Sequence, residues 1–368
     1  MYYSEDFYRL AIQHQEGYGP SSIKKMLKWT GNATHIFEEP DSWKSHIRSP
    51  KRTIHPPTIS NALRRLVDEE LKAMDKAGIR LCFYTDRDFP YRLKLCNDSP
   101  LSFFYQGNGE FNMPHILAIV GTRNASAYGR ECVGKILSEL QGTDVVTVSG
   151  LAYGIDTEAH QKSLENRLRT IAVLGSGLGV IYPYQNRELA WRILDNGGTL
   201  ISEYPYSTPP DRLNFPKRNR IIAGISDATL VMESGEKGGS IITAYIAQSY
   251  NRDVLAIPGQ IHDPMHSGCH QLIQKNVAAL ITSGDDILDI MNWRTSSSTG
   301  TQTQLFVELT ETEQPIVDLL RGQGAAPIDK IAEQFPNYTP SQLAGVLLGL
   351  ELKNVITCKP GKLYSVKL

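Results

Sequence analysis

The sequence predicts an α/β protein whose central domain is an extended Rossmann-like, doubly wound parallel sheet. Six apolar, β-branched runs of strand length recur between residues 116 and 258, and helical patterns separate them. Strands of a parallel sheet are covered by helices on both faces and are therefore almost continuously apolar, as these runs are. Regular alternation of strand and helix favours right-handed crossovers within one sheet. We expect a small helical domain before this sheet and a winged-helix domain after it.

Composition limits the classes of function. The chain has 368 residues, which fits about two to three domains. Its formal net charge is −1, so a nucleic-acid site must be a local patch rather than a general positive field. Five scattered cysteines form no CxxC pair and suit a reducing compartment. The first residues lack the features of a signal peptide, and no apolar run approaches about 18 residues. We therefore expect a cytoplasmic protein with no membrane partner.

Residues 1–75 show helical patterns and no convincing strand, which predicts a small helical domain of the SAM or helix-hairpin-helix type. The segment Gly17-Tyr18-Gly19-Pro20 precedes one of these helices. In a helix-hairpin-helix module the backbone amides of such a turn can meet a phosphate. A plain Gly/Pro turn that joins two packed helices explains the same residues equally well.

From residue 76 to residue 292 the pattern is that of the Rossmann-like domain. The expected strands cover residues 116–120, 144–149, 170–174, 199–203, 228–233 and 253–258. The expected helices between them include Arg130–Leu140, Asp156–Asn166, Arg187–Leu194 and Ser240–Tyr250. In such sheets a ligand binds beyond the carboxyl ends of the strands, where the strand order reverses.

Four glycine-rich loops follow these strands and are expected to share one edge of the sheet. They read GTR from residue 121, GLAYGID from 150, GSGLG from 175 and SGEKGGS from 234. Glycine lets backbone N–H groups approach a ligand closely, and each loop leads toward a helix N-terminus that favours negative charge. Arg123 adds a planar cation suited to phosphate oxygens. One such loop can be merely a tight turn, but four of them with Arg123 predict a phosphate-binding edge.

The segment NFPKRNRIIAG, residues 214–224, raises an electrostatic question. Pro216 predicts the first position of a helix. Lys217, Arg218 and Arg220 then crowd the end of the helix that carries partial positive charge, where each exposed cation costs about 0.3–1 kcal/mol. A polyanionic ligand would offset this cost, and Phe215 beside it could stack on a base.

A purely structural explanation of that segment also remains open. In it, Phe215 belongs to the core and the cations form a solvated face with Asp211 and Glu203. The three isoleucines that follow the cations supply the buried face of the helix in either case: Ile221, Ile222 and Ile225.

Neither a dinucleotide cofactor nor a metal ion is expected. The GSGLG loop imitates the dinucleotide fingerprint, with Glu203 as a candidate ribose ligand, but Tyr182-Pro183 follows and the next helix begins only near Asn186. The third glycine therefore cannot seat a helix against the strand. The cluster of His262, His266, Cys269 and His270 has no regular zinc spacing and predicts a loop that opens a helix.

Residues 293–308 are polar and rich in Ser and Thr, which predicts a flexible linker. Residues 309–368 then show three helices and a hairpin, the pattern of a winged helix. Thr339 and Gln342 predict a capping box, with Pro340 in the first turn. This helix presents Thr339, Ser341 and Gln342 rather than Arg or Lys, so a sequence-specific major-groove reader is doubtful. A protein contact, or a weak DNA contact through Lys359 and Lys362, is equally compatible.

Six linked motifs carry a family resemblance: IVGTRNASAYG, VSGLAYGIDTEAH, AVLGSGLGVIYPYQN, GGTLISEYP, NFPKRNRIIAGISDATLVMESGEKGGSIITAYIA and VLAIPG. Together they resemble the DNA-processing protein A (DprA/Smf) family over most of residues 76–290. The resemblance implies an extended Rossmann-like fold that binds single-stranded DNA without hydrolysing it. It also implies a homodimer formed through this domain, protection of incoming DNA, and loading of the RecA recombinase during natural transformation and recombination.

The resemblance also implies which residues contact DNA or shape its pocket, with no catalytic residue and no cofactor. These residues are Gly121, Thr122, Arg123, Ser149, Gly150, Leu151, Gly154, Gly175, Phe215, Lys217, Arg218, Asn219, Arg220, Gly238, Gly239, Ser240 and Thr243. On this interpretation, Arg123→Glu, or Lys217→Glu combined with Arg218→Glu, would weaken DNA binding and leave the fold intact.

An enzyme is the alternative from another class. Nucleotide phosphoribohydrolases of the LOG type share the Rossmann variant and carry a PGGxGTxxE loop whose glutamate performs the chemistry. The segment GGSIITAY begins similarly, but it places Tyr245, or Ile246 if the register shifts by one residue, where the glutamate should stand. Glu236 precedes the glycines and cannot substitute in the same geometry. Hydrolysis is therefore disfavoured, because the general acid/base is missing.

Overall fold

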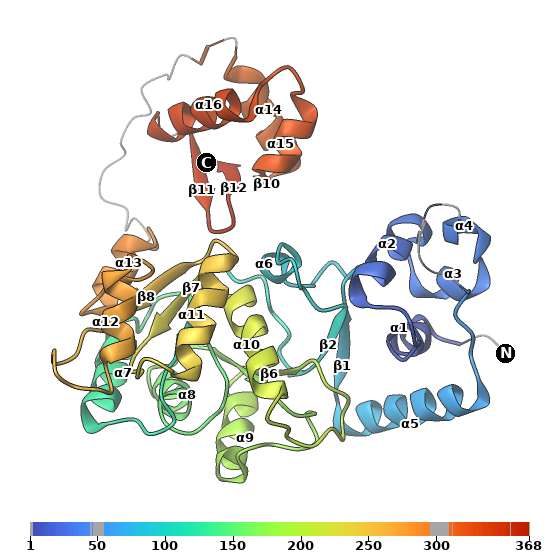
Figure 1. Cartoon of the computed structure of the whole chain (residues 1–368), viewed down its shortest axis with the longest axis horizontal. Helices are drawn as coiled ribbons and strands as arrows, with labels where there is room; N and C mark the ends of the chain where they lie inside the picture. Colours follow the sequence, from blue (N-terminus) through green and yellow to red (C-terminus); the bar gives the residue numbers. More distant parts are fainter. Residues whose placement is uncertain are drawn as a thin grey trace.

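The computed structural model describes residues 3–44, 46, 55–294, 309–310, 312–353 and 355–367. Its central feature is a sheet with the strand order β1-β2-β6-β5-β4-β3-β7-β8-β9. Figure 1 shows β1 and β2 on the side of the sheet nearer the N-terminus. The strands are β1 (Arg80–Phe83), β2 (Ser102–Gly107), β3 (His115–Val120), β4 (Val145–Ser149), β5 (Thr170–Leu174), β6 (Thr199–Ser202), β7 (Ala228–Val231), β8 (Asp253–Ala256) and β9 (Ala279–Leu280). Strands β3 to β9 are parallel to one another, which confirms the predicted doubly wound sheet. Strands β1 and β2 extend it in antiparallel fashion.

Helices cover both faces of this sheet. They are α6 (Tyr91–Lys94), α7 (Ala127–Glu139), α8 (Ile155–Glu165), α9 (Arg187–Asp195), α10 (Asn214–Ile225), α11 (Gly239–Ser249), α12 (Ser267–Gln274) and α13 (Gly284–Ile290), with a 3-10 turn at Tyr184–Asn186. Side chains of β3 alternate between the two faces. Ile116 and Ala118 pack in one buried cluster with α10 and α11, whereas Leu117 and Ile119 pack in another with α7 and α8. This period of two explains why the strand is apolar at every position.

The N-terminal helices pack against the antiparallel side of the sheet. They are α1 (Glu5–Gln13), α2 (Pro20–Thr30), α3 (Ala33–Glu38), α4 (Asp41–Lys44) and α5 (Asn61–Ala77). Their buried residues share one apolar cluster with residues of the sheet such as Phe83 and Phe104. Residues 1–2, 45 and 47–54 of the predicted helical domain lie outside the described residues.

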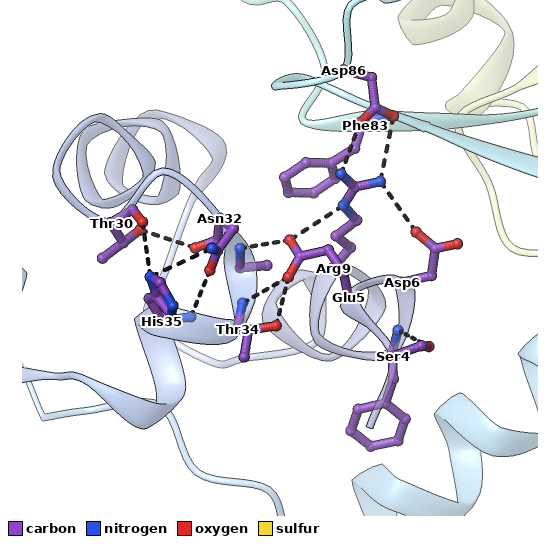
Figure 2. A network of polar contacts seen from close by, with 12 residues as sticks. Ser4, Glu5, Asp6, Arg9, Thr30, Asn32, Thr34, His35, Phe83 and Asp86 are labelled. Atoms are coloured by element: carbon purple, nitrogen blue, oxygen red, sulfur yellow. Dashed lines mark hydrogen bonds and ion pairs between the residues drawn. The ribbon is translucent and has the colours of Figure 1, made fainter. Parts of the chain in front are cut away.

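A polar network fixes α1 in this position (Figure 2). One Glu5 oxygen accepts a hydrogen bond from the Ala33 amide at 2.7 Å, and the other accepts from the Thr34 hydroxyl at 2.6 Å. One turn later, Arg9 pairs with Asp86 at 2.8 Å, in the turn that follows β1. Because Asp86 also accepts from the Phe83 amide, the network joins α1 both to α3 and to the first strand.

The C-terminal segment has its own sheet and core. Its elements are α14 (Gln314–Gln323), β10 (Ala326–Pro327), α15 (Ile328–Gln334), α16 (Pro340–Leu352), β11 (Ile356–Lys359) and β12 (Leu363–Val366). Its strands pair in the order β10-β12-β11. The predicted capping box is present, because the Thr339 hydroxyl accepts from the Gln342 amide and the Gln342 side chain accepts from the Thr339 amide. The winged-helix assignment stays a prediction, and residues 295–308 of the predicted linker lie outside the described residues.

Within the described part of the chain, no helix combines the length and the apolar character needed to cross a bilayer.

Candidate functional site

A pocket of about 400 Å3 lies at the carboxyl ends of β3 and β7. These strands are neighbours, and the chain proceeds outward from them in opposite directions, so the pocket occupies the point where strand order reverses. The loops after β3 and β7 and the first turns of α10 and α11 form its walls. The predicted residues that line it are Gly121, Thr122, Arg123, Phe215, Arg218, Asn219, Gly238, Gly239, Ser240 and Thr243.

Other predicted residues lie behind the wall of the pocket. Ser149 is buried and donates to the Ile119 carbonyl at 2.7 Å, and Leu151 is fully buried. A Cβ atom on Gly175 would come within 2.8 Å of the Phe215 ring, so the absence of a side chain at Gly175 leaves room for this ring. A Cβ on Gly150 would come within 2.4 Å of the Arg218 guanidinium. These residues do not line the pocket but lie behind the residues that line it.

Three helix N-termini surround the pocket and give it a positive potential. Asp156 in α8, Phe215 in α10 and Ser240 in α11 all line it from the first turns of their helices. Unpaired N–H groups and the helix dipole favour an anion there. Helix α10 begins at Asn214, so the prediction that Pro216 opens it was wrong by two residues. Pro216 still lies in the first turn, where its missing N–H leaves no bond unmade.

Arg218 was predicted to contact DNA, but it is buried within the protein. Its side chain is only 4% exposed, and it donates to the Gly150 carbonyl at 2.5 Å and to the Val173 carbonyl. Burial lowers its pKa to about 10, which still leaves the guanidinium charged at neutral pH. Arg218 therefore joins α10 to β5 and to the loop after β4. We therefore expect Lys217→Glu combined with Arg218→Glu to destabilise the fold rather than leave it intact, because these carbonyls would face a buried carboxylate.

Arg220 is also engaged within the protein. Its guanidinium forms an ion pair with the Glu203 carboxylate and donates to the Asp98 carbonyl at 2.8 Å. It does not line the pocket. The structural alternative placed the cations on a solvated face with Asp211 and Glu203. Arg220 does pair with Glu203, but the pair is partly buried. A DNA contact for Arg220 stays a prediction that this pairing does not favour.

Arg123, Arg212 and Lys217 are exposed. Arg123 and Arg212 line the pocket, whereas Lys217 does not. The Arg123 guanidinium lies 5.5 Å from the centre of the Phe215 ring, and Tyr182 contacts the same ring at a centroid distance of 5.6 Å. Phe215 is only partly buried, so its ring remains available to a ligand. A cation over an aromatic face beside helix N-termini is suited to a phosphate and an adjoining base.

Sequence reasoning missed two charged residues of the pocket. Arg212 lines it from the residues just before α10, and its proximity to the basic segment was the available signal. Asp156 lines it from the second residue of α8. Burial raises the pKa of Asp156, while the nearby Arg218 charge and hydrogen bonds act against that rise. The described residues that line the pocket include three arginines and one carboxyl group, that of Asp156. The charged side chains of the pocket are therefore mainly positive.

His160, on the buried side of α8, provides a pH test of this region. Burial lowers its pKa to about 3, and the Arg218 charge acts in the same direction. The unfolded chain regains the ordinary value of 6.5 and binds one more proton than the folded state below that pH. We expect this residue to reduce stability by about 1.4 kcal/mol per pH unit as pH falls from 6.5 toward 3, with no effect above that window.

The measurement is urea unfolding of wild type and His160→Gln at about pH 7 and about pH 5. Stability should fall less steeply toward low pH in the variant, whatever its stability at neutral pH. Equal slopes in the two proteins would contradict the buried neutral imidazole.

The two alternative sites have ordinary structural explanations. His266 contacts Asp263 at 3.0 Å and His270 contacts Gly259, and the described residues contain no group of three or more His, Cys, Asp or Glu arranged to hold a metal ion. In the GSGLG loop, Gly179 packs against the Tyr206 ring instead of seating a helix, and α9 begins only at Arg187.

Comparisons with known proteins identify the family of the chain. The sequence model of the DNA recombination-mediator protein A family matches residues 80–292. The chain is 43% identical over 203 residues to DNA processing protein DprA of Streptococcus pneumoniae, covering 55% of this chain and 71% of that protein. It is 35% identical over 303 residues to Protein Smf of Escherichia coli, covering 81% of this chain and 80% of that protein.

Solved structures extend the comparison. The X-ray structure of DNA processing protein A from S. pneumoniae superposes with a TM-score of 0.63 at 34% identity, covering 78% of this chain and 98% of that one. DNA processing protein A from Helicobacter pylori, described for its single-stranded DNA binding mode, gives a TM-score of 0.53 at 25% identity, covering 59% of this chain and 97% of that one. The chain therefore belongs to the DNA recombination-mediator protein A family, whose curated relatives are named DprA and Smf.

Proposed function

We propose that this protein binds single-stranded DNA in the pocket at the ends of β3 and β7. The observation that carries the proposal is the grouping of Arg123, Arg212 and the partly exposed Phe215 around three helix N-termini. Phosphates would meet the arginines and the backbone amides, and a base would stack on Phe215. Family membership and the H. pylori relative's described binding of single-stranded DNA support this assignment.

The pocket favours a single strand over a duplex for a geometric reason. Phe215 offers a ring face next to Arg123, so base and phosphate must be presented together from one flexible strand. In a duplex the bases are stacked and paired, and their faces cannot reach an aromatic side chain without being unpaired. Sequence preference should be weak, because every base has a face that can stack.

Arg123→Glu tests the proposal. It removes a phosphate partner and places a negative charge in the pocket, so affinity for oligo-dT should fall on the order of tenfold or more, and the wild-type affinity should fall steeply with salt. Fluorescence polarisation of labelled oligo-dT measures both.

The matched control for that experiment is Arg87→Glu, which makes the same charge change at an exposed arginine beyond edge strand β1. It should bind within about twofold of wild type, since four strands separate β1 from β3, a span of about 24 Å at roughly 4.8 Å per strand, which exceeds the Debye length of about 10 Å at moderate salt. Equal affinities of the two variants would remove the pocket from consideration as the DNA site.

We further propose that the protein binds this DNA without hydrolysing it or acting on nucleotides. Tyr245 in α11 stands at the position where a LOG-type phosphoribohydrolase carries its glutamate, and a phenol does not replace a carboxylate as the general acid/base. Purified protein should release no ribose phosphate from nucleoside monophosphates. Release of ribose phosphate at an enzymatic rate would favour the enzyme alternative.

Membership of this family is the basis for several proposals about the wider role of the protein. We propose a cytoplasmic protein that forms a homodimer through its Rossmann-like domain, protects incoming DNA and loads RecA onto it. Its five free cysteines suit that compartment. Residues 1–75, 76–292 and 309–368 would be a helical domain, the DNA-binding domain and a winged helix. Sedimentation tests the dimer, and nuclease protection and RecA filament assembly on coated single strands test the other two roles.

A further inference from the structure

A second hollow, of about 560 Å3, lies between the end of α5, the loop after β5 and the start of α9. We name it the aromatic groove and define it by Tyr184, Trp191, Tyr206, Arg187 and Lys76, which line it. Its aromatic side chains come from three separate elements: the 3-10 turn before α9, helix α9 itself, and the segment after β6.

Two of these rings are open to solvent. Tyr184 is 73% exposed and Trp191 is 49% exposed. Large aromatic side chains grouped on a surface mark a site of contact with a ligand, because isolated exposure is common but clustering is not. Their flat faces suit either nucleic-acid bases or a protein partner, so the charges around them decide between these ligands.

The charges favour a polyanion. Arg187 and Lys76 are exposed and line the groove, and the described residues that line it include no Asp or Glu. Neither cation has a hydrogen-bond or ion-pair partner within the described part of the chain. Two unpaired cations beside exposed aromatic faces are what a single strand requires: attraction for its phosphates and stacking for its bases.

One loop connects this groove with the pocket. Gly175 at its start packs under Phe215, which lines the pocket, whereas Leu178, Gly179 and Ile181 line the groove. Tyr182 follows Ile181 directly, is itself exposed, and contacts the Phe215 ring. Aromatic residues therefore extend along the chain from the pocket to the groove: Tyr182 contacts Phe215, and Tyr184, two residues later, lines the groove with Trp191.

From this continuity we propose that a single DNA strand held in the pocket continues across Tyr182 into the aromatic groove. There its bases stack on Tyr184 and Trp191, and its phosphates meet Arg187 and Lys76. This proposal rests on the proposed function and adds a second subsite to it. The groove lengthens the bound segment, so affinity should increase with oligonucleotide length beyond what the pocket alone can hold.

The test compares oligo-dT of about 4 nucleotides with oligo-dT of about 16 nucleotides, the range that single-strand sites span. Trp191→Ala should leave the affinity for the short oligonucleotide unchanged and weaken the long one roughly tenfold, as the loss of one stacked base does. Arg187→Gln should reduce the salt dependence of the long oligonucleotide alone, by about 0.7 in the log–log slope.

The matched control is Trp29→Ala, because Trp29 is similarly exposed, at 53%, on the N-terminal helix α2. It should change neither affinity. Thermal unfolding of each variant shows that the fold is kept. Trp191→Phe adds a second readout: it preserves stacking, but the quenching of tryptophan fluorescence by the long oligonucleotide should largely disappear.

The outcomes separate this proposal from the proposed function. If wild type binds neither oligonucleotide, or if Arg123→Glu binds both normally, the pocket assignment fails. If Arg123→Glu weakens both while Trp191→Ala binds the long oligonucleotide as wild type does, only the groove assignment fails. Equal weakening of both lengths by Trp191→Ala, or unchanged quenching in Trp191→Phe, also overturns the groove. A change of sedimentation in Trp191→Ala without a change of affinity would assign the rings to a protein contact instead.

Discussion

Replacing Arg218 with alanine is expected to lower the free energy of unfolding by about 3–5 kcal/mol. The buried guanidinium satisfies the carbonyls of Gly150 and Val173 and offsets the charge of the buried Asp156 carboxylate. Alanine would leave both carbonyls without these donors, leave the carboxylate without its nearby cation, and open a cavity behind the pocket. A loss of this size is a large part of the total stability of a domain, about 5–15 kcal/mol.

Lys217→Ala is the matched control, since this neighbouring cation of the same helix turn is exposed. Its effect on stability should stay within about 0.5 kcal/mol. Urea unfolding followed by circular dichroism measures both variants. If Arg218→Ala and Lys217→Ala unfold at the same urea concentration, Arg218 does not hold the loops together. Adding Asp156→Asn should restore part of the loss, because it removes the unbalanced charge.

Gly154→Ala is expected to cost about 2–5 kcal/mol, from backbone strain and a steric clash together. Gly154 precedes α8 with φ 75° and ψ −123°, a conformation that residues with a side chain rarely adopt. A Cβ there would lie 2.3 Å from the Thr122 carbonyl oxygen and 2.5 Å from the Arg123 carbonyl carbon. The loop after β3 must then shift, so we expect a loss of oligo-dT affinity as well.

Gly142→Ala separates the two contributions. Gly142 also has a positive φ, 82°, but an added Cβ would meet nothing within 4 Å. Its variant should cost only about 1–2 kcal/mol, the price of the backbone conformation alone. Thermal unfolding and polarisation with labelled oligo-dT measure stability and affinity. Equal stabilities, or an unchanged affinity of Gly154→Ala, would show that the loop after β3 tolerates the side chain.

The parallel part of the fold was predictable from sequence because its strands carry a strong local signal. The run TIAVL, residues 170–174, is a strand with the predicted bounds, and the other five predicted runs differ from β3, β4, β6, β7 and β8 by one or two residues at an end. The two antiparallel strands, β1 and β2, were not predicted from such a local signal. Strand β2, Ser102–Gly107, pairs with β6, which follows it by about a hundred residues, and no local pattern encodes such a partner.

The site was predictable as a location but not in the roles of its side chains. Glycines 121, 238 and 239 converge on one pocket because the topology brings the ends of β3 and β7 together. The three cations of the NFPKRNR segment look alike in sequence, yet Arg218 is buried, Arg220 pairs with Glu203, and Lys217 is exposed. Whether such a side chain is buried, paired or exposed depends on its position around the helix axis and on partners distant in sequence. Residue type alone reveals neither.

The C-terminal segment has an apolar cluster made only of its own residues, among them Ile316, Leu347 and Ile356. The three clusters that stabilise the rest of the protein contain none of them. Loss, duplication or exchange of this segment would therefore leave the apolar clusters of the remainder complete. Apart from contacts such as the one from the Gly361 amide to the Asn251 carbonyl, substitutions on its surface would not disturb the sheet, whereas the pocket is constrained by the same buried contacts that keep the sheet folded.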